Sequence, residues 1–516
     1  MGSASSAPLA TVPSTMNEKS SSGAESSRRR TTTTDAQQLL AQLSLGGSSK
    51  SKPATAMMSI DSLRSWEKAF ESNPKHKLAA TFMHKNDFQT AMVQRKAVVS
   101  DQQVFNVTLS SENSTVANQK SSGRCWCFAL CNVIRLAMQR KYNLEEFELS
   151  QSYLFFYDSL AKANWFLEQM LDLAEEDLDD RTVQYLMQAP ENDGGQWDMA
   201  VNLVEHFGLV PQTVYPESFN SSSTGKLDDL LTSKLREYAL ELRELHANAM
   251  DCLGDITTKS HGEKKALAAQ SSRKRKEEQM EEIYRILAIT LGTPPKPDEE
   301  FTWEYYDTKK KYHSVTSTPK SFAKDYALVD VSKAISLIHD PRNAPGLYTV
   351  DRLGNVVGGR PVLYVNTEIE DLKNVAIKLL KNDTPVWFGC DVGKSSNTPL
   401  GLMDTKLFDL EEAFSTSLGM TKAQRLSTGD SAMTHAMVLT AVHLDANGKP
   451  VRWRVENSWS KEACTKGYML MTDEWFTEHV FQVVADRSMV PKELVKVFED
   501  DNRTVLPPWD PMGALA

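Results

Sequence analysis

One cysteine stands where a polar, glycine-containing loop gives way to an apolar helical pattern. The loop covers Gln119 to Arg124 and the apolar pattern begins at Cys125, so Cys125 is expected at the amino terminus of a helix. The positive end of a helix dipole favours a thiolate over a thiol, and the thiolate is the nucleophile. The segment therefore predicts nucleophilic catalysis by Cys125.

A cysteine nucleophile needs a base, and two of the ten histidines stand out. His435 and His443 lie at the two ends of one apolar strand pattern, and their even spacing places both on the same face. Periodicity does not choose between them. The next strand pattern, Val451–Glu456, is followed by Asn457, whose amide could orient an imidazole on the neighbouring strand. Cys125, a histidine and Asn457 would then supply a nucleophile, a base and an orienting group.

The other cysteines indicate packing and a reducing compartment. Cys127 and Cys131 lie deeper in the same helical pattern, four residues apart, and are expected to pack in the core. A metal site would need Cys-x-x-Cys pairs or added histidines, which this segment lacks, so no metal and no other cofactor is expected. Six cysteines in 516 residues are too few for a disulfide framework, and the amino terminus has no apolar signal segment.

Composition and charge limit the class of protein. Hydrophobic residues make up 41% of the chain and the net charge is −10, which excludes collagenous and coiled-coil chains and gives no global attraction to polyanions. No apolar stretch approaches the ~18 residues that a membrane-spanning helix needs, so no membrane partner is expected. Residues 1–55 are rich in Ser and Thr and are expected to form a disordered tail. A cytoplasmic location is expected, with mitochondrial import through this tail as the alternative.

The elements that must position these residues change character along the chain. Helical patterns cover residues 125–138 and 150–173, and two further apolar stripes, 227–245 and 280–291, predict a helical hairpin. Between the stripes, Arg273–Lys276 is a basic run whose ordinary meaning is a solvated helix face or loop, with a polyanion site as the alternative. Beyond Pro345 the pattern predicts strands at Leu347–Val350, Val362–Val365, Pro385–Cys390, Ala436–Leu444, Val451–Glu456 and Gly467–Met471.

A helical first half and a β-rich second half predict two lobes with a site in the cleft between them. We expect five segments: a tail at 1–55, a helical lobe with the nucleophile at 56–225, a helical insertion at 226–345, a β-rich lobe with the histidine and asparagine at 346–500, and a carboxyl-terminal arm at 501–516.

Several of these residues together resemble a known family. Gln119 six positions before Cys125, the Cys-Trp pair, His435 before small and apolar residues, and Asn457-Ser458-Trp459 are similar to papain-type cysteine peptidases. The resemblance is closer to the bleomycin hydrolase family, also called the aminopeptidase C group. Its segments are Asn118–Trp126, Asn192–Met199, Pro385–Gly393, Met433–Val438, Val455–Trp459 and Trp509–Ala516.

The chain differs from a minimal papain-type domain in the spacing between Cys125 and His435, and from the family pattern at two positions. His435 lies 310 residues after Cys125, whereas a minimal papain-type domain separates the two by about 130–150 residues, so an inserted module is required. Ser460 stands where the family usually has Gly, and Cys127 where an apolar residue is common. Neither departure falls on Cys125, His435 or Asn457.

The resemblance implies an α+β fold, papain-like and two-lobed with a helical insertion that mediates assembly into a homohexamer. It implies roles for the residues that match its motifs. Gln119 and the backbone N–H of Cys125 would form an oxyanion hole, and Trp459 would shield the hydrogen bond between His435 and Asn457. Gly194 and Gly195 would let substrate backbone pair with the chain.

The resemblance also implies the reaction and the arm. The chain is expected to be a cysteine aminopeptidase that releases single residues from peptides and hydrolyses an amide of bleomycin. Residues 506–516 are too rich in proline for a helix or a central strand and would lie in the active-site cleft, with the Ala516 carboxylate facing the substrate's ammonium group. The alternatives are a homocysteine-thiolactone hydrolase or acyl transferase using the same three residues, and a nucleic-acid-binding regulatory hexamer. For the last, weak binding of single-stranded nucleic acid by Arg273–Lys276 is the hypothesis.

Overall fold

The computed structural model describes residues 56–111, 116–254 and 258–516. The tail predicted over residues 1–55 lies outside the described residues. The chain divides into two compact units, a smaller one of Met1–Met92 and Asp409–Met420 and a larger one of Val93–Phe408 and Thr421–Ala516. The described helices of the smaller unit are α2 (Ile60–Ser72), α3 (Pro74–Met83), α4 (Phe88–Ala91) and α15 (Leu410–Phe414).

The larger unit contains every residue to which the sequence analysis gave a catalytic or binding role. Its α-helices are α5 (Arg95–Ser100), α6 (Cys125–Tyr142), α7 (Gln151–Asp172), α8 (Arg181–Gln188), α9 (Trp197–Phe207), α10 (Phe219–Ser222), α11 (Gly225–Leu253), α12 (His261–Leu291), α13 (Pro319–Asp325), α14 (Ile369–Lys381), α16 (Lys422–Thr428), α17 (Asp473–His479) and α18 (Lys492–Glu499). Short 3-10 turns are η1 (Val331–Lys333), η2 (Arg487–Met489) and η3 (Pro511–Gly513).

Twelve strands form one mixed sheet in the larger unit, in the order β14-β5-β6-β4-β13-β7-β10-β11-β12-β9-β8 with β1 beside β10. These strands are β1 (Val107–Thr108), β4 (Ala334–Ile338), β5 (Gly346–Val350), β6 (Tyr364–Asn366), β7 (Val386–Cys390), β8 (Ser396–Asn397), β9 (Leu402–Met403), β10 (His435–Leu444), β11 (Pro450–Glu456), β12 (Tyr468–Thr472), β13 (Val480–Asp486) and β14 (Arg503–Leu506). The pairs β4–β6, β5–β14 and β9–β12 are parallel. A separate antiparallel hairpin consists of β2 (Phe301–Tyr306) and β3 (Tyr312–Ser317).

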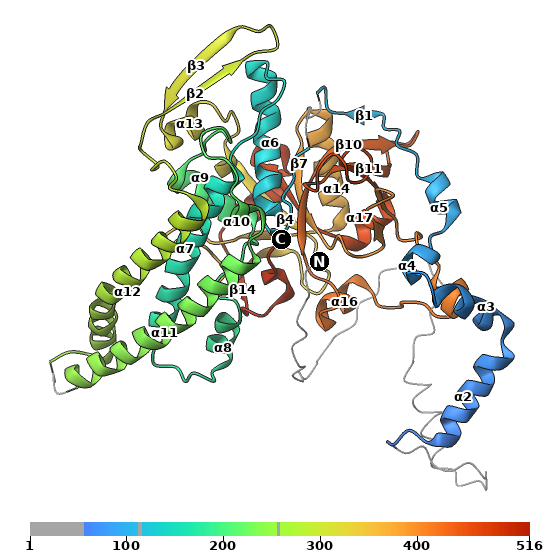
Figure 1. Cartoon of the computed structure of the whole chain (residues 1–516), viewed down its shortest axis with the longest axis horizontal. Coiled ribbons are helices and arrows are strands. Elements are labelled where there is room, and N and C mark those ends of the chain that lie inside the picture. The colour runs from blue at the N-terminus through green and yellow to red at the C-terminus, as the bar shows by residue number, and fades with distance from the viewer. Residues whose placement is uncertain (1–55, 112–115, 255–257) are drawn as a thin grey trace. The chain divides into compact units, whose positions relative to one another are not determined.

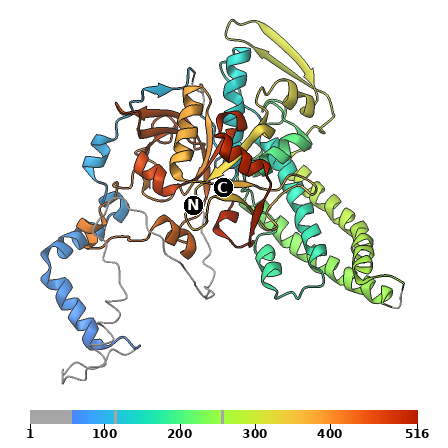
Figure 2. The ribbon, with the colours of Figure 1, turned by 180° about the vertical axis from the view of Figure 1, so that it is seen from behind.

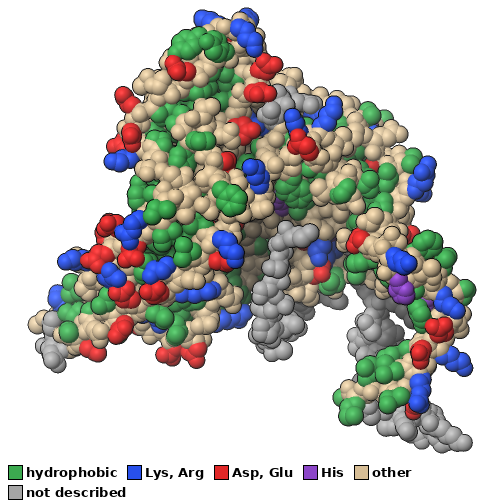
Figure 3. Space-filling model, viewed as in Figure 1, with side chains coloured by type: hydrophobic (Ala, Val, Ile, Leu, Met, Phe, Trp, Pro, Cys, Tyr) green, Lys and Arg blue, Asp and Glu red, His purple; other side chains and the backbone are tan. Residues whose placement is uncertain are grey.

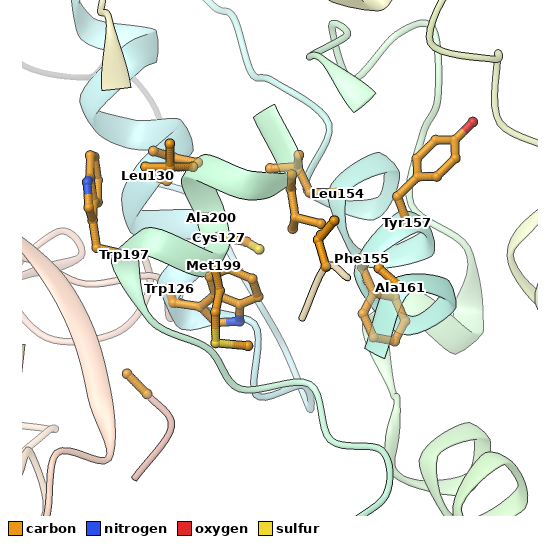
Figure 4. Close-up of a cluster of buried hydrophobic side chains, with 14 of the residues drawn as sticks. Trp126, Cys127, Leu130, Leu154, Phe155, Tyr157, Ala161, Trp197, Met199 and Ala200 are labelled. Carbon is orange, nitrogen blue, oxygen red and sulfur yellow. The ribbon is translucent and has the colours of Figure 1, made fainter. Parts of the chain in front are cut away.

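Helix α6 begins at Cys125, as the sequence predicts, and Asn143 ends it in the left-handed conformation with a φ of 52°. Its first turns are buried against α7 and α9, and Figure 4 shows Trp126, Cys127 and Leu130 beside side chains of those two helices. Cys127 and Cys131 are each 1% exposed, which confirms that they pack in the core. Because α6 is buried on most of its surface, the position of its first residue is fixed from several sides.

The predicted helical hairpin is present as α11 and α12, which lie beside α7 (Figure 1). The view from behind shows the same arrangement (Figure 2). Helix α12 starts earlier than expected, at His261, because Ser260 and Glu263 form a capping box. The basic run Arg273–Lys276 is therefore part of a helix rather than of a loop.

The β-rich part of the chain starts earlier than predicted. Strand β4 lies inside the segment that the sequence analysis assigned to the insertion, and it joins the large sheet between β6 and β13. The β2–β3 hairpin also lies inside that segment. Strands β13 and β14 were not predicted, although β13 is buried along most of its length. The large sheet thus begins before the expected segment boundary at residue 345.

Candidate active site

One cavity of about 590 Å³ in the larger unit brings together residues from distant parts of the sequence. Gln119, Cys125, Gly194, His435 and Ala516 all line it. They come from the loop before α6, the first residue of α6, the segment before α9, the first residue of β10 and the end of the chain. Cys125 and His435 are 2% and 5% exposed, so a reaction between them would proceed largely screened from water.

The hydrogen bonds around His435 define which ring nitrogen carries the proton. His435 Nε2 lies 2.9 Å from Asn457 Oδ1, and the same oxygen accepts from the backbone N–H of Ser458 at 2.8 Å. Because Oδ1 already accepts from an N–H, it acts as an acceptor toward the imidazole, and Nε2 must donate. Nδ1 is then the basic nitrogen. The backbone N–H next to His435, that of Ala436, donates to Cys125 Sγ at 3.4 Å, which places the thiol against the start of the strand that carries His435.

Burial dominates the ionisation of Cys125 and His435. It raises the pKa of Cys125 to about 12, against the hydrogen bond from the Ala436 N–H and with a further rise from Asp193. Burial also lowers the pKa of His435 to about 4, against the hydrogen bond to Asn457. Burial of the site therefore opposes the thiolate form of Cys125 that the helix terminus favours.

Gln119 is held by the loop that carries Asn457. Its backbone N–H donates to Ser458 O at 2.8 Å, and its Oε1 accepts from Ser458 Oγ at 2.5 Å. Gln119 Nε2 donates to Ser122 O at 2.6 Å, which leaves the second N–H of that amide for the cavity that Gln119 lines. Ser458, to which the sequence analysis gave no role, thus joins Gln119 to the loop that carries Asn457.

Trp459 and Ser460 follow in the same loop. The Trp459 ring centroid lies 5.1 Å from that of His435, with an interplanar angle of 32°, so the indole lies against the imidazole. Ser460 has a φ of 75°, in the left-handed region where glycine is favoured. The departure from the family pattern at this position therefore puts a side chain where the backbone suits glycine.

The segment Asn192–Gly194 lines one side of the cavity, and neither Gly194 nor the following Gly195 has room for a side chain. A Cβ on Gly195 would lie 2.5 Å from the Trp126 ring, and one on Gly194 would lie 2.9 Å from Leu515 Cβ. The segment is also tied to α6, because the Trp126 indole N–H donates to Asp193 O at 2.8 Å. Two glycines are thus required here by close packing on both sides.

The end of the chain is paired with the backbone of Gly195. Gly195 N donates to Ala516 O at 3.0 Å and Ala516 N donates to Gly195 O at 3.2 Å, which is the pattern of one antiparallel strand pair. Gln196 Nε2 adds a bond to Ala514 O at 2.6 Å. Met512 and Ala516 are 1% and 3% exposed. Residues 512–516 are therefore bound along the cavity rather than frayed.

Two predicted features lie apart from the cavity. His443 is at the far end of β10, in register with Arg452, and is not among the described residues that line the cavity. In the basic run, Arg273 and Lys276 pair with Glu168 at 2.7 and 2.5 Å, and Arg275 pairs with Glu241 and Glu278. Figure 3 shows Lys and Arg intermixed with Asp and Glu in the region of α11 and α12. Three of the four basic side chains thus have carboxylate partners within the unit.

Comparisons with known proteins agree with this geometry. The model of the peptidase C1-like family matches residues 57–513. Rat bleomycin hydrolase is 45% identical over 457 residues, which cover 86% of this chain and 96% of the rat protein. Cysteine proteinase 1, mitochondrial, of Saccharomyces cerevisiae is 42% identical over 473 residues, 90% of this chain and 94% of the yeast protein. The crystal structure of PepW from Lactobacillus rhamnosis has a TM-score of 0.82 at 40% identity and covers 90% of this chain and 100% of its own.

The described helices give no sign of a membrane span. None of those between residues 56 and 516, outside the two short gaps, combines the length and the apolarity that crossing a bilayer requires.

Proposed function

Since the chain belongs to the peptidase C1-like family and is a cysteine peptidase of the bleomycin hydrolase and aminopeptidase C type, we propose that it removes residues singly from the amino termini of peptides. The observation that carries this specificity is the pairing of Ala516 with Gly195 in the cavity lined by Cys125. A bound chain end shortens the groove on one side of the nucleophile. An open groove would instead accept internal peptide segments.

In the proposed reaction Cys125 and His435 change protonation together. The thiol proton moves to His435 Nδ1 as Sγ attacks the carbonyl carbon, and the imidazolium then protonates the leaving amine. Asn457 holds the ring through Nε2, and its own acceptor role is fixed by the Ser458 N–H. Water, activated by the neutral imidazole, hydrolyses the thioester and restores the thiol.

The oxyanion of the tetrahedral intermediate needs donors close to Cys125 Sγ. The backbone N–H of Cys125 is one of the free donors at the start of α6, and the second N–H of the Gln119 amide is the other in our proposal. Donors of this kind contribute about 3–4 kcal/mol each to the stabilisation of the transition state. Trp459 against the His435 ring would limit the access of water to the His435–Asn457 hydrogen bond.

The carboxyl-terminal arm, Met512–Ala516, would set the position of the substrate. With Ala516 on Gly195, only one residue fits between the arm and the nucleophile in this proposal. The Ala516 carboxylate would meet the ammonium group of that residue, a charge pair that a blocked amino terminus cannot form. Gly194 and Gly195 serve here by lacking side chains, which leaves room for Leu515 and Ala516 against them.

The names of the relatives extend the proposal to other substrates. The rat relative is named a bleomycin hydrolase, and we propose that this chain hydrolyses an amide of bleomycin with the same residues. Hydrolysis of homocysteine thiolactone or acyl transfer to amines would use the same acyl-enzyme. Partitioning of the acyl group between water and added amines, measured by mass spectrometry of the products, separates hydrolysis from transfer.

Assembly and location are also part of the proposal. We propose a homohexamer with the α11–α12 hairpin at its contacts, to be tested by light scattering after size-exclusion chromatography. The location would be cytoplasmic, and the yeast relative with the word mitochondrial in its name supports import as the alternative. Imaging of the full chain and of a chain lacking residues 1–55 distinguishes the two.

The decisive experiment for the aminopeptidase proposal is deletion of Met512–Ala516. The deletion is expected to lower kcat/KM for free-amino peptides and to expose cleavage of N-acetylated peptides. Removal of residues 1–50 is the control truncation and should change neither. If the arm deletion leaves the discrimination between free and acetylated peptides unchanged, the arm does not set the specificity, although the assignment of Cys125 and His435 would survive.

A further inference from the structure

A buried lysine with no part in the proposed chemistry lies against the segment Asn192–Gly194 and itself lines part of the cavity. Lys162 belongs to α7, and its side chain is 6% exposed. Its Nζ donates to Asn192 O at 2.7 Å and to Gly194 O at 2.6 Å, and it lies 2.6 Å from Asp158 Oδ2. An ammonium group has three N–H donors, and these three acceptors use all of them.

The charge of Lys162 is balanced and its position is fixed. Although burial opposes the charge, the carboxyls of Asp158 and Glu191 raise the pKa of Lys162 above its usual value. Asp158 is itself held by the amide of Asn355 at 2.9 Å. The ammonium also lies 5.5 Å from the centroid of the Trp126 ring. A charged group with three directed hydrogen bonds therefore joins α7 to the backbone on both sides of Asp193.

The carbonyl of Gly194 points inward to Lys162, while the N–H and C=O of Gly195 point to Ala516. We infer that Lys162 is a positioning residue for the carboxyl-terminal arm. It fixes the backbone of Asn192–Gly194, and through Gly195 it fixes the position of Ala516. The position of Ala516 in turn determines where the amino terminus of a substrate binds. Lys162 does not touch the reacting atoms in this scheme. It affects the selectivity between free-amino and acetylated peptides through the backbone of Asn192–Gly195.

This inference rests on the proposed function for its effect on selectivity, but not for its effect on the arm itself. Hydrogen bonds to a charged donor contribute more than neutral ones, so their loss should loosen the Gly195–Ala516 pair. In Lys162→Met the ratio of kcat/KM for a free-amino peptide to that for its N-acetylated form is expected to fall about tenfold or more. Lys162→Arg keeps the charge and should recover most of the ratio.

Two further variants separate positioning from general damage. Lys373 is a matched control, because it is also a buried lysine, 2.7 Å from Asp473 Oδ2 and 2.8 Å from Thr477 Oγ1, and it does not line the cavity. Lys373→Met should leave the ratio unchanged. The double variant Asp158→Asn, Lys162→Met removes both charges, so that the test does not depend on a chain destabilised by an unpaired buried carboxylate.

The variants are compared in the full chain and in the chain lacking Met512–Ala516. If Lys162 acts through the arm, Lys162→Met lowers the ratio in the full chain and has no further effect on it after truncation. An equal loss of activity on free and acetylated peptides would overturn the inference, because that is what a merely structural lysine would give. A change of the ratio that persists in the truncated chain would also overturn it.

A second measurement tests whether Lys162 positions the arm, even if the arm does not determine the selectivity for free-amino peptides. Carboxypeptidase digestion of the folded full chain releases the terminal residues only when the arm leaves the cavity. Lys162→Met is expected to speed the release of alanine and leucine at least about tenfold relative to Lys373→Met. If truncation leaves the ratio unchanged but release is faster in Lys162→Met, the proposed function fails and the positioning role stands. Unchanged release would overturn the positioning role.

Discussion

The guanidinium of Arg124, the residue before the nucleophile, donates to both carboxylate oxygens of Glu217, at 3.1 and 3.0 Å. Its Nε donates to Ser122 Oγ at 3.0 Å, and that hydroxyl donates to Gln119 O at 2.7 Å. The guanidinium also lies near the rings of Phe128 and Phe155. An ion pair with a buried arginine and a partly exposed glutamate thus holds the loop that presents both Gln119 and Cys125.

Arg124→Met is expected to destabilise the larger unit strongly, because it leaves Glu217 without its bidentate partner. Because the Glu217 side chain is 21% exposed, the loss of stability should lie below the ~3–5 kcal/mol typical of a fully buried pair, seen as a lower midpoint of urea unfolding. Lys406→Met is the control, since its pair with Glu474 is exposed on both sides and should cost about 1 kcal/mol or less. Equal shifts in the two variants would show that the Arg124 pair is not structurally important.

Cys125→Ser is expected to abolish hydrolysis, with a loss of at least about 10⁴-fold in kcat. Cys127→Ser should retain most of the activity, because Cys127 is packed in the core and faces no substrate. Purified variants are assayed on a free-amino peptide after their folding is checked by circular dichroism. An inactive but folded Cys127→Ser enzyme would mean that the nucleophile is misassigned.

His435→Ala and His443→Ala form a second matched pair on one strand. His435→Ala should be inactive, because it removes the base beside Cys125. His443→Ala should keep its turnover and lose only stability, since His443 lies at the other end of β10. The two are compared by kcat and by melting temperature. Loss of turnover in His443→Ala with His435→Ala active would reverse the assignment.

The pH dependence follows from the two shifted pKa values. His435, with its pKa lowered to about 4, loses its proton above that pH, and Cys125, with its pKa raised to about 12, keeps its proton below that pH. Between these two pKa values Cys125 and His435 therefore share one proton. The fraction of molecules in which that proton is on the imidazole, and Cys125 is a thiolate, does not depend on pH. Alkylation of Cys125 by iodoacetamide should be flat from about pH 5 to pH 9.

Free cysteine serves as the reference in the same experiment. Its alkylation should rise about tenfold per pH unit up to its pKa of about 8.5. The rate at Cys125 is read from the loss of peptidase activity. A rate that climbs with pH in parallel with free cysteine would show that Cys125 reacts as an independent thiol without a proton shared with His435.

The local sequence pattern was sufficient for some features and not for others. Helix α6 starts at Cys125, where a polar loop meets an apolar pattern. That boundary can be predicted because it depends on residues adjacent in the sequence. The order Gln119, Cys125, His435, Asn457 follows from motifs, and the structure places the first three around one cavity. Strand β4 was missed, although its five residues are buried and it lies between β6 and β13 in the sheet.

The buried contacts were also beyond the local pattern. Nothing in the sequence around Lys162 shows that its ammonium reaches Asn192 and Gly194, thirty and thirty-two residues away. The helix terminus that favours the Cys125 thiolate is visible in the sequence, whereas the burial that raises the pKa of Cys125 is not. Desolvation depends on every element packed around the site, so only the folded chain reveals it.

Gly194→Ala and Gly195→Ala are expected to change different kinetic properties, although the two residues are adjacent. A Cβ on Gly194 would meet Leu515 and Ala516, whereas one on Gly195 would meet the Trp126 ring beside Cys125. Gly194→Ala is therefore expected to displace the arm and lower the preference for free-amino peptides. Gly195→Ala should lower kcat on both free and acetylated peptides. Steady-state kinetics on the two peptides checks this, and identical profiles for the two variants would contradict the assigned contacts.

Binding of single-stranded DNA by Arg273–Lys276 is expected to be negligible. Three of the four side chains already pair with carboxylates of α7, α11 and α12, which cancels the local positive charge. Fluorescence anisotropy with a labelled oligonucleotide should show no saturable binding below about 100 μM at 150 mM salt, the weak end of non-specific affinities.

Lys274 and Arg273 provide the variants that decide this last point. Lys274 has no ion pair among the described residues, so Lys274→Glu changes the surface charge without unpairing a carboxylate. Arg273→Glu, in contrast, places a second carboxylate beside Glu168 and should lower the melting temperature. Submicromolar binding that weakens steeply with salt and is lost in Lys274→Glu would establish a phosphate-binding surface.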